Sequence, residues 1–212
     1  MLKILNKTRK VSGKMSVPKQ IMTTFFALLF GGGMGIVAKF LDLNRLPSFL
    51  DWLDLSNFLG RTAPWIFIAV CLAVFSKSPL KAGINVFAFF AGMVASYYLY
   101  SNYIAGFFPR SYAMIWFGFT AVSPLLAFVC WYAKGKSKLA FILSALILAV
   151  LFNMCFVYGC WYFNAKSVLE VIVFIIGLIV LRRDTLRSSA LMGTISIVLA
   201  VLLDMVIPFH FG

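Results

Sequence analysis

The stretch Lys-Gly-Lys-Ser-Lys at residues 134–138 separates two long hydrophobic runs, 112–133 and 139–162. Three more basic clusters are spaced along the chain, at Lys3–Lys19, Lys77–Lys81 and Arg182–Arg187. Two apolar segments lie between each neighbouring pair of clusters. A chain that crosses a bilayer twice between clusters places all four on one face. The excess of Lys and Arg in cytoplasmic loops predicts that this face is the cytoplasmic one.

The overall composition is that of a membrane protein. Of the 212 residues, 63% are hydrophobic and only 12% are charged, whereas about a quarter of a soluble domain is charged. The lipid bilayer is therefore the first predicted partner. The net charge of +13 lies in short loops beside apolar runs, where topology and anionic lipid headgroups account for it. We therefore predict no nucleic-acid partner.

We predict an all-α integral membrane protein, a bundle of seven transmembrane helices with its N-terminus inside and its C-terminus outside. The predicted spans are 20–41, 62–78, 82–101, 112–133, 139–162, 165–181 and 189–207. About 20 helical residues cross a hydrocarbon core of about 30 Å, so the second and sixth spans are short. Leaving out either one puts a basic cluster on the outer face. An alternative with six spans and one short or re-entrant segment stays open.

The chain divides simply around these spans. Residues 1–19 form a basic cytoplasmic segment, residues 20–207 a single transmembrane helical domain, and residues 208–212 an outer C-terminal tail. The connections are short, and the chain shows no targeting or glycosylation feature. We therefore expect a multi-pass protein of a plasma membrane, and a bacterial one.

The outer segment 47–60 has the pattern of a short helix. Ser48 is a plausible N-cap and Gly60 a plausible C-terminal stop. Asp51 and Asp54 share one sector of the helical wheel, and the aromatic and leucine side chains share another. Two interpretations stay open: an interfacial helix lying on the outer leaflet, or a lid over a cavity that opens to the outside.

Small residues predict close helix packing in two spans. Gly31 and Gly35 form a Gly-x-x-x-Gly face in the first span. Ala88, Gly92 and Ser96 belong to a small-residue stripe in the third span. Such faces let helix backbones approach closely in lipid. We expect them to pack tightly, either against each other or against a partner membrane protein or a second copy of the chain.

Two carboxylates at membrane depth are the candidate functional residues. Glu170 lies about one turn into the sixth span, and Asp204 about one turn from the outer end of the seventh. Acids at this depth usually face a bundle interior or water and mark functional sites. We predict an outward-facing polar pocket for a small, cationic solute, with Asn85 and Asn153 as further hydrogen-bonding groups.

The same acids also have a purely structural interpretation. Glu170 would pair with Lys166, four residues earlier, and Asp204 with Arg61 or Arg110 at the outer rim. Both acids are shallow enough to be wetted, which lowers the free energy of burying them.

The sequence predicts no catalytic residues, no metal site and no cofactor. The single histidine, His210, lies three residues from the end, and neither His-Glu-x-x-His nor Gly-x-Ser-x-Gly occurs. The four cysteines form no Cys-x-x-Cys pair and lie in apolar runs. We therefore predict that the chain is not an enzyme, and keep an enzyme built on carboxylates alone as an alternative.

Two family resemblances follow from local stretches. Leu-Gly-Arg-Thr-Ala-Pro-Trp at 59–65, followed by Ala82-Gly83 and by Ala-Ser-Tyr-Tyr at 95–98, resembles a family of small multi-pass bacterial membrane proteins of unknown function. That resemblance extends over about residues 20–200 and implies a helical bundle in a plasma membrane.

The glycine-rich first span is similar in kind to the substrate-binding subunits of energy-coupling-factor vitamin transporters. In those six-helix proteins a small-residue helix face docks on a partner, and the first long outer loop, here 42–61, closes the site. This chain departs from them, because it has seven predicted spans and lacks a clear Ala-x-x-x-Ala pattern in the first span.

Three functions from different classes follow. A small-solute binding or transport-type protein predicts that Glu170 and Asp204 face one cavity together with Asn85 or Asn153. A structural or accessory subunit predicts a filled bundle with the Gly31/Gly35 face exposed to a partner. A membrane enzyme acting on a lipid-linked substrate predicts polar groups beside a lateral opening to lipid. The outer acids favour the first.

Overall fold

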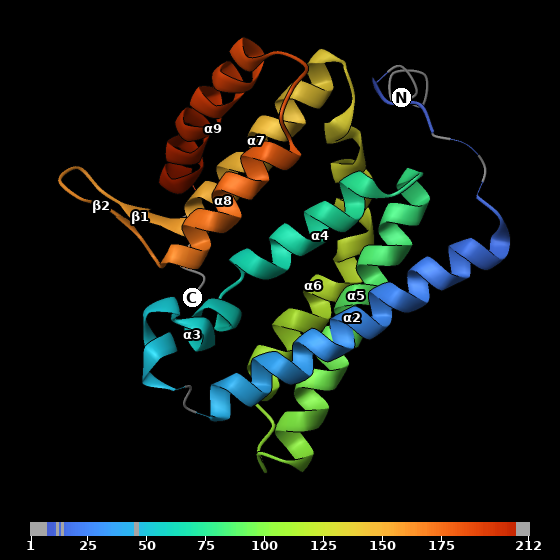
Figure 1. The fold of residues 1–212 in the computed structure, drawn as a ribbon, viewed down its shortest axis with the longest axis vertical. Helices are drawn as coiled ribbons and strands as arrows, with labels where there is room; N and C mark the ends of the chain where they lie inside the picture. The colour runs from blue at the N-terminus through green and yellow to red at the C-terminus, as the bar shows by residue number, and fades with distance from the viewer. Residues whose placement is uncertain (1–7, 12, 14, 45–46, 207–212) are drawn as a thin grey trace. The chain divides into compact units, whose positions relative to one another are not determined.

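The fold is all-α, as predicted. The computed structural model describes residues 8–11, 13, 15–44 and 47–206. The predicted outer tail, 208–212, and part of the basic segment 1–19 lie outside these residues. Among those described, one two-stranded hairpin supplies the β-structure and nearly everything else is helix or short connection (Figure 1).

Five of the described helices are long and apolar enough to cross a membrane. They are α2 (Val17–Leu43), α5 (Pro79–Tyr103), α6 (Arg110–Trp131), α7 (Lys138–Cys155) and α9 (Leu186–Val206). The 3₁₀ turn η2 (Tyr132–Lys134) extends α6. Two further apolar helices, α4 (Ala63–Phe75) and α8 (Val168–Val180), have 13 residues each. At 1.5 Å per residue each is about 20 Å long, less than the hydrocarbon thickness of about 30 Å.

The chain folds as two compact units. One contains α2, α5 and α6, from Val11–Pro47 and Leu72–Trp131. The other contains α7, α8, α9 and the segment before α4, from Met1–Lys10, Ser48–Cys71 and Tyr132–Gly212. Helix α4 begins in the second of these and ends in the first. We call them the α5 unit and the α7 unit, after the helix that contacts most of its neighbours in each.

In the α5 unit, α2 and α5 touch through their backbones (Figure 1). A Cβ atom placed on Gly31 would lie 2.0 Å from the carbonyl oxygen of Phe89, and one on Gly92 would lie 2.2 Å from that of Leu28. Any side chain at these two glycines therefore forces the helices apart. Helix α6 packs on α5 as well.

The remaining small residues of the predicted faces lie at the same contact. A Cβ atom on Gly35 would lie 2.2 Å from the Ser96 hydroxyl oxygen, and Ala88 is buried. Of the two arrangements left open by the sequence, the structure has the two spans against each other. The Gly31/Gly35 face is therefore covered within the chain and not exposed, contrary to what the accessory-subunit hypothesis predicts.

In the α7 unit, α7 lies between α8 and α9. Its N-cap Ser137 accepts a hydrogen bond from the backbone N–H of Ala140 (3.2 Å), and Ser167 caps α8 by accepting one from the N–H of Leu169 (3.2 Å). Such caps satisfy N–H groups that a helix start leaves without partners. The contact with α9 is built around Ala149, Phe152 and Ala200.

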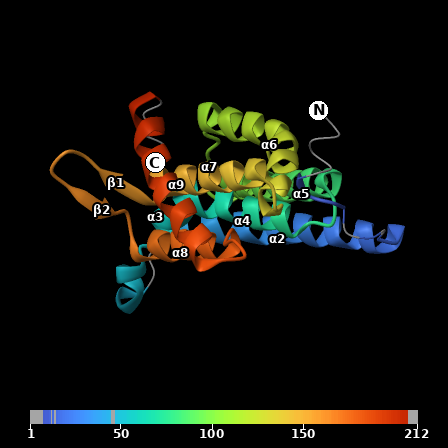
Figure 2. The same cartoon turned by 90° about the horizontal axis from the view of Figure 1, so that it is seen from above.

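A β-hairpin follows α7, so the predicted span 139–162 is wrong in its last seven residues. Strand β1 (Phe156–Tyr158) pairs antiparallel with β2 (Phe163–Ala165), and both views show the hairpin extending away from the helices of its unit (Figures 1 and 2). The rings of Phe156 and Phe163 stack at 5.2 Å between centroids. Aromatic residues favour strands as well as membranes, which is why hydropathy alone overran the helix end.

The segment 47–60, which we predict to lie on the outer side, is not one helix. It forms a 3₁₀ helix η1 (Ser48–Leu53) and an α-helix α3 (Leu55–Gly60). Ser48 is the first residue of η1 and not the residue before it, whereas the helical segment does end at Gly60 as predicted. Asp54 interrupts it with a left-handed φ of 50°. Aspartate tolerates this conformation better than most residues because its short side chain bonds locally, and the Asp54 carboxylate does so with Asn57 (2.6 Å).

Candidate functional site

The candidate site is a cluster of charges in the α7 unit, built around Glu170. Glu170 lies in the first turn of α8, and its side chain is completely buried, with 0% exposed. The N-cap Ser167 donates its hydroxyl to Glu170 Oε2. A carboxylate in the first turn also lies in the favourable field of the helix N-terminus. One oxygen of this carboxylate is therefore stabilised by a residue only three positions away in the chain.

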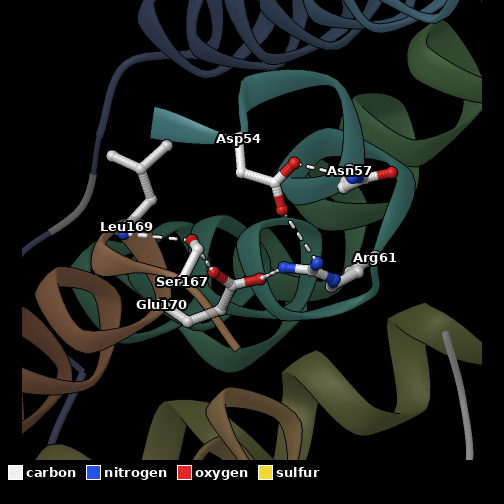
Figure 3. Close-up of polar contacts among 6 residues, drawn as sticks. All are labelled: Asp54, Asn57, Arg61, Ser167, Leu169 and Glu170. Carbon is white, nitrogen blue, oxygen red and sulfur yellow. Dashed lines mark hydrogen bonds and ion pairs between the residues drawn. The ribbon is translucent and has the colours of Figure 1, made fainter. Parts of the chain in front are cut away.

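The other oxygen of Glu170 is bound by Arg61, which lies 109 residues away in the chain. Arg61 follows α3 directly, and its Nη1 donates to Glu170 Oε1 at 2.6 Å. Its Nη2 donates to Asp54 Oδ2 at 3.0 Å. Figure 3 shows the Arg61 guanidinium lying between the two carboxylates. One arginine therefore links Asp54 in the segment 47–60 to the start of α8.

Exposure falls in order through this cluster. The side chain of Asp54 is 32% exposed, that of Arg61 19%, and that of Glu170 0%. Asp54 also accepts a hydrogen bond from Asn57 Nδ2 at 2.6 Å (Figure 3). Arg61 is thus the half-buried member through which the buried carboxylate is linked to the exposed one.

The pKa values of the two basic groups near Glu170 shift in opposite directions. Burial lowers the pKa of Arg61, but the hydrogen bonds and charges of Glu170 and Asp54 outweigh burial, and the pKa is raised. Burial lowers the pKa of Lys166, the charge of Arg61 lowers it further, and Glu170 only partly compensates. The sequence-based pairing of Glu170 with Lys166 is therefore wrong, because Arg61 is the hydrogen-bonded partner.

Asp204 and Asn153 lie in the same unit but have other neighbours. Asn153 Nδ2 donates to the carbonyl oxygen of Ala200 in α9 at 2.9 Å, and its Oδ1 accepts from the Tyr158 hydroxyl at 2.9 Å. Burial, and then the charge of Asp204, raise the pKa of Tyr158. Asp204 itself is half-buried near the end of α9.

Asp204 has no hydrogen bond or ion pair with any described residue of the α7 unit, so the predicted pairing with Arg61 is wrong, and the pairing with Arg110, which belongs to the α5 unit, stays a prediction. Arg61 binds Glu170 and Asp54 instead. Asn153 is hydrogen-bonded to Tyr158 of the hairpin, and Asp204 acts electrostatically on the same tyrosine. Glu170 is paired with Arg61 instead. The two acids have different polar partners.

Asn85 belongs to the α5 unit. Its Oδ1 accepts from the Thr24 hydroxyl at 3.0 Å, and its Nδ2 donates to the Ser76 hydroxyl at 3.4 Å. Thr24 also accepts from Lys81 Nζ. The amide of Asn85 is therefore engaged in joining α2 and α5.

The cluster offers charge and hydrogen bonds but little covalent chemistry. Among the described residues, no group of three or more His, Cys, Asp or Glu side chains is arranged to hold a metal ion. What Asp54 and Glu170 do bind is a planar cation, the Arg61 guanidinium. Comparisons with models of known protein families, with curated proteins and with solved structures found no match to this chain.

Proposed function

We propose that this is a multi-pass plasma-membrane protein of the solute-binding or transport type, which takes a small cationic solute on its outer side. The observation that carries the proposal is the buried carboxylate of Glu170, whose counter-ion comes from outside the predicted spans. Ionisable groups at membrane depth are uncommon and mark functional sites more often than not.

In this proposal Arg61 is the resident cation of the site. Removing the partner of a buried charge destabilises a protein by about 3–5 kcal/mol, so Glu170 is not left bare. A solute cation that replaces Arg61 at Glu170 supplies the new counter-charge. Arg61 keeps its contact with Asp54, which is partly exposed, during such an exchange. Asp54 therefore already provides a carboxylate that holds Arg61 when the solute displaces it from Glu170.

We further propose seven spans, with α4 and α8 counted among them. The ends of α8 lie beside the ends of α7, which is itself long enough to cross. The N–H of Lys166 donates to the carbonyl of Cys155 at one end (3.0 Å), and Arg183 donates to the carbonyl of Gly135 at the other (2.6 Å). A short apolar helix is accommodated by local thinning of the bilayer.

Helix α4 is placed in a similar way within the α7 unit. Its first residue, Ala63, packs against Cys155 at the end of α7. Cys71, near its other end, lies within electrostatic range of Lys134, just before the start of α7. With both short helices crossing, all four basic clusters lie on one face, which we propose is the cytoplasmic face of a bacterial plasma membrane.

The test is a thermal-unfolding screen of the purified chain in lipid nanodiscs against primary amines, quaternary amines and methylguanidinium at millimolar concentration. We expect at least one class of cation to raise the unfolding midpoint, and Glu170→Gln to lose that rise. Asp204→Asn is the matched control, because it removes another carboxylate of the same unit. No rise with any cation, or an equal loss in both variants, contradicts the proposal.

A second candidate, a structural or accessory subunit of a membrane complex, is favoured by one observation. Both oxygens of Glu170 already have partners within the chain, Ser167 and Arg61. In that case methylguanidinium restores the thermal stability of an Arg61→Ala variant by filling the vacated position, but no cation stabilises the natural sequence. The same screen therefore separates the two functions.

A further inference from the structure

We infer that the α7 unit carries a second site, a basic cavity that binds a phosphate-bearing anion. It lies where η2 leads into α7 and where α8 leads into α9, at the end of α8 remote from Glu170. The cavity has a volume of about 330 Å³. Its charged lining is Lys134, Lys136, Arg182, Arg183 and Asp184.

Two basic clusters that are far apart in the sequence meet here because α7 and α8 are antiparallel neighbours. Arg183 Nη1 donates to the carbonyl of Gly135 at 2.6 Å, and its Nη2 donates to the Ser144 hydroxyl at 3.1 Å. Lys134 Nζ donates to the carbonyl of Val180. These contacts are made to neutral oxygens, and they hold the two loops together.

The charges of the cavity are unbalanced. Four cations face one carboxylate, and the ion pair between that carboxylate, Asp184, and Lys136 is long, at 3.7 Å. Both of its side chains are more than four-fifths exposed, and exposed pairs of this kind contribute little. Arg9 also acts electrostatically on Lys134. The described lining of the cavity is therefore strongly positive and suits an anionic ligand.

Hydrogen-bond donors are available as well as charge. Nε of Arg183 is buried and has no acceptor among the residues that the structure describes. Burial lowers the pKa of Arg183, and an added anion offsets that effect by stabilising the charged form. An oxyanion in the cavity forms charge-assisted hydrogen bonds with cations of this kind.

Two helix starts border the same cavity. Ser137 precedes α7 and Thr185 precedes α9, and both line the cavity. Each caps one N–H with its side chain, that of Ala140 and that of Ser188 respectively (3.2 Å in both cases). A helix start leaves four N–H groups without helical partners, so uncapped donors remain at both. Phosphate groups bind at such positions because of these donors and the helix dipole.

The ligand class is a phosphate mono- or diester, supplied either by an anionic lipid headgroup or by a soluble phosphate compound. A second hollow of about 440 Å³ shares Lys136, Ser137 and Phe141 with the cavity and extends to Ile142, which is exposed. An apolar extension beside a cationic cavity suits the glycerol and acyl chains that follow a lipid phosphate.

The test measures anion binding by the full chain in two arms. In the first, inorganic phosphate and glycerol 3-phosphate are titrated in neutral nanodiscs. In the second, nanodiscs of phosphatidylcholine are compared with nanodiscs that also contain phosphatidylglycerol. The readout in both is the thermal-unfolding midpoint, with the ligand affinity taken from its concentration dependence in the first arm.

The diagnostic variant is Lys136→Gln/Arg182→Gln, which removes two exposed cations of the cavity and spares Arg183, whose side chain joins the two loops. The control, Lys10→Gln/Arg187→Gln, removes two exposed cations that do not line it. We expect stabilisation of the natural sequence in at least one arm, and binding at least about tenfold weaker in the diagnostic variant only.

The outcomes separate the ligand sources. Stabilisation by phosphatidylglycerol alone assigns the site to lipid, and stabilisation by glycerol 3-phosphate or phosphate assigns it to a soluble compound. Equal losses in the two double variants show general attraction between net charges and overturn the proposal, as does the absence of stabilisation in both arms. None of these results depends on the cation screen, which concerns Glu170 at the other end of α8.

Discussion

The two ends of α8 handle charge in opposite ways. At the start of the helix, a fully buried carboxylate has an arginine and a serine as partners, and the same arginine binds a second carboxylate. At its end, four cations face one carboxylate around an open cavity. In the first arrangement the described residues supply partners for both carboxylate oxygens of Glu170, and in the second we propose that an outside anion balances the charge. Substitutions at the first end should therefore change the stability of the fold as well as the proposed cation binding, and substitutions at the second should change anion binding alone.

The contrast between the two sites requires the two ends of α8 to lie on opposite faces of the membrane. Cys160 is exposed on the hairpin beside the first end. We expect a membrane-impermeant maleimide to label it in intact cells. Lys136→Cys in a Cys160→Ser background should be labelled only after the cells are permeabilised.

The labelling yields should differ almost completely between the two positions before permeabilisation. The Cys160→Ser chain without a new cysteine gives the background from the other native thiols. Labelling of both positions from the same face contradicts the proposed seven spans.

The largest expected change in stability belongs to Arg61. Arg61→Ala leaves Glu170 buried without its cation, and we expect a loss of about 3–5 kcal/mol in the free energy of unfolding. Arg61→Met/Glu170→Met removes both charges, and such paired apolar replacements are often neutral or stabilising. Unfolding in mixed micelles measures both variants. A loss below about 1 kcal/mol in the single variant means that the pair is solvated like a surface ion pair.

The long helices could be predicted from the sequence because a long apolar run between basic clusters has few structures other than a helix available to it in lipid. The end of α7 could not, since Phe156 and Phe163 serve a strand as well as they serve a hydrophobic span. The left-handed turn at Asp54 was also missed, because a helical wheel records faces and not backbone breaks.

The site was predictable only in part, and for a related reason. The depth of Glu170 is a local property, and it follows from its position after Ser167. Its partner is not local: Arg61 is 109 residues away and is brought to Glu170 by tertiary packing. Arg61 was considered as a partner for Asp204, since it is one of few cations on the predicted outer side. Which acid it meets depends on the order of helices in the bundle.

A smaller loss is expected at the exposed end of the same cluster. Asp54→Asn keeps a residue that tolerates the left-handed conformation and removes only the charge that Arg61 binds. Because Asp54 is about one-third exposed, we expect a loss of about 1 kcal/mol or less in the free energy of unfolding. A loss as large as that of Arg61→Ala, measured in the same assay, shows that the two carboxylates act as one unit.

The smallest expected change sharpens the contrast with the cavity. Without added anion, Lys136→Gln/Arg182→Gln should leave the free energy of unfolding within about 0.5 kcal/mol of its natural value, as for most surface substitutions. Because the substitutions relieve repulsion between the cations, we expect the free energy of unfolding to rise slightly. A loss of several kcal/mol means that these side chains support the fold, and that the two ends of α8 are alike.

The backbone contact between α2 and α5 has a mechanical consequence. Side chains can change rotamer to let helices slide, but two backbones in contact have no such freedom. At Gly31 and Gly92 even a Cβ atom would lie within 2.2 Å of a carbonyl oxygen of the facing helix, so a slide of α2 along α5 meets backbone and not a side chain that can move aside. We therefore expect α2 and α5 to behave as one rigid body.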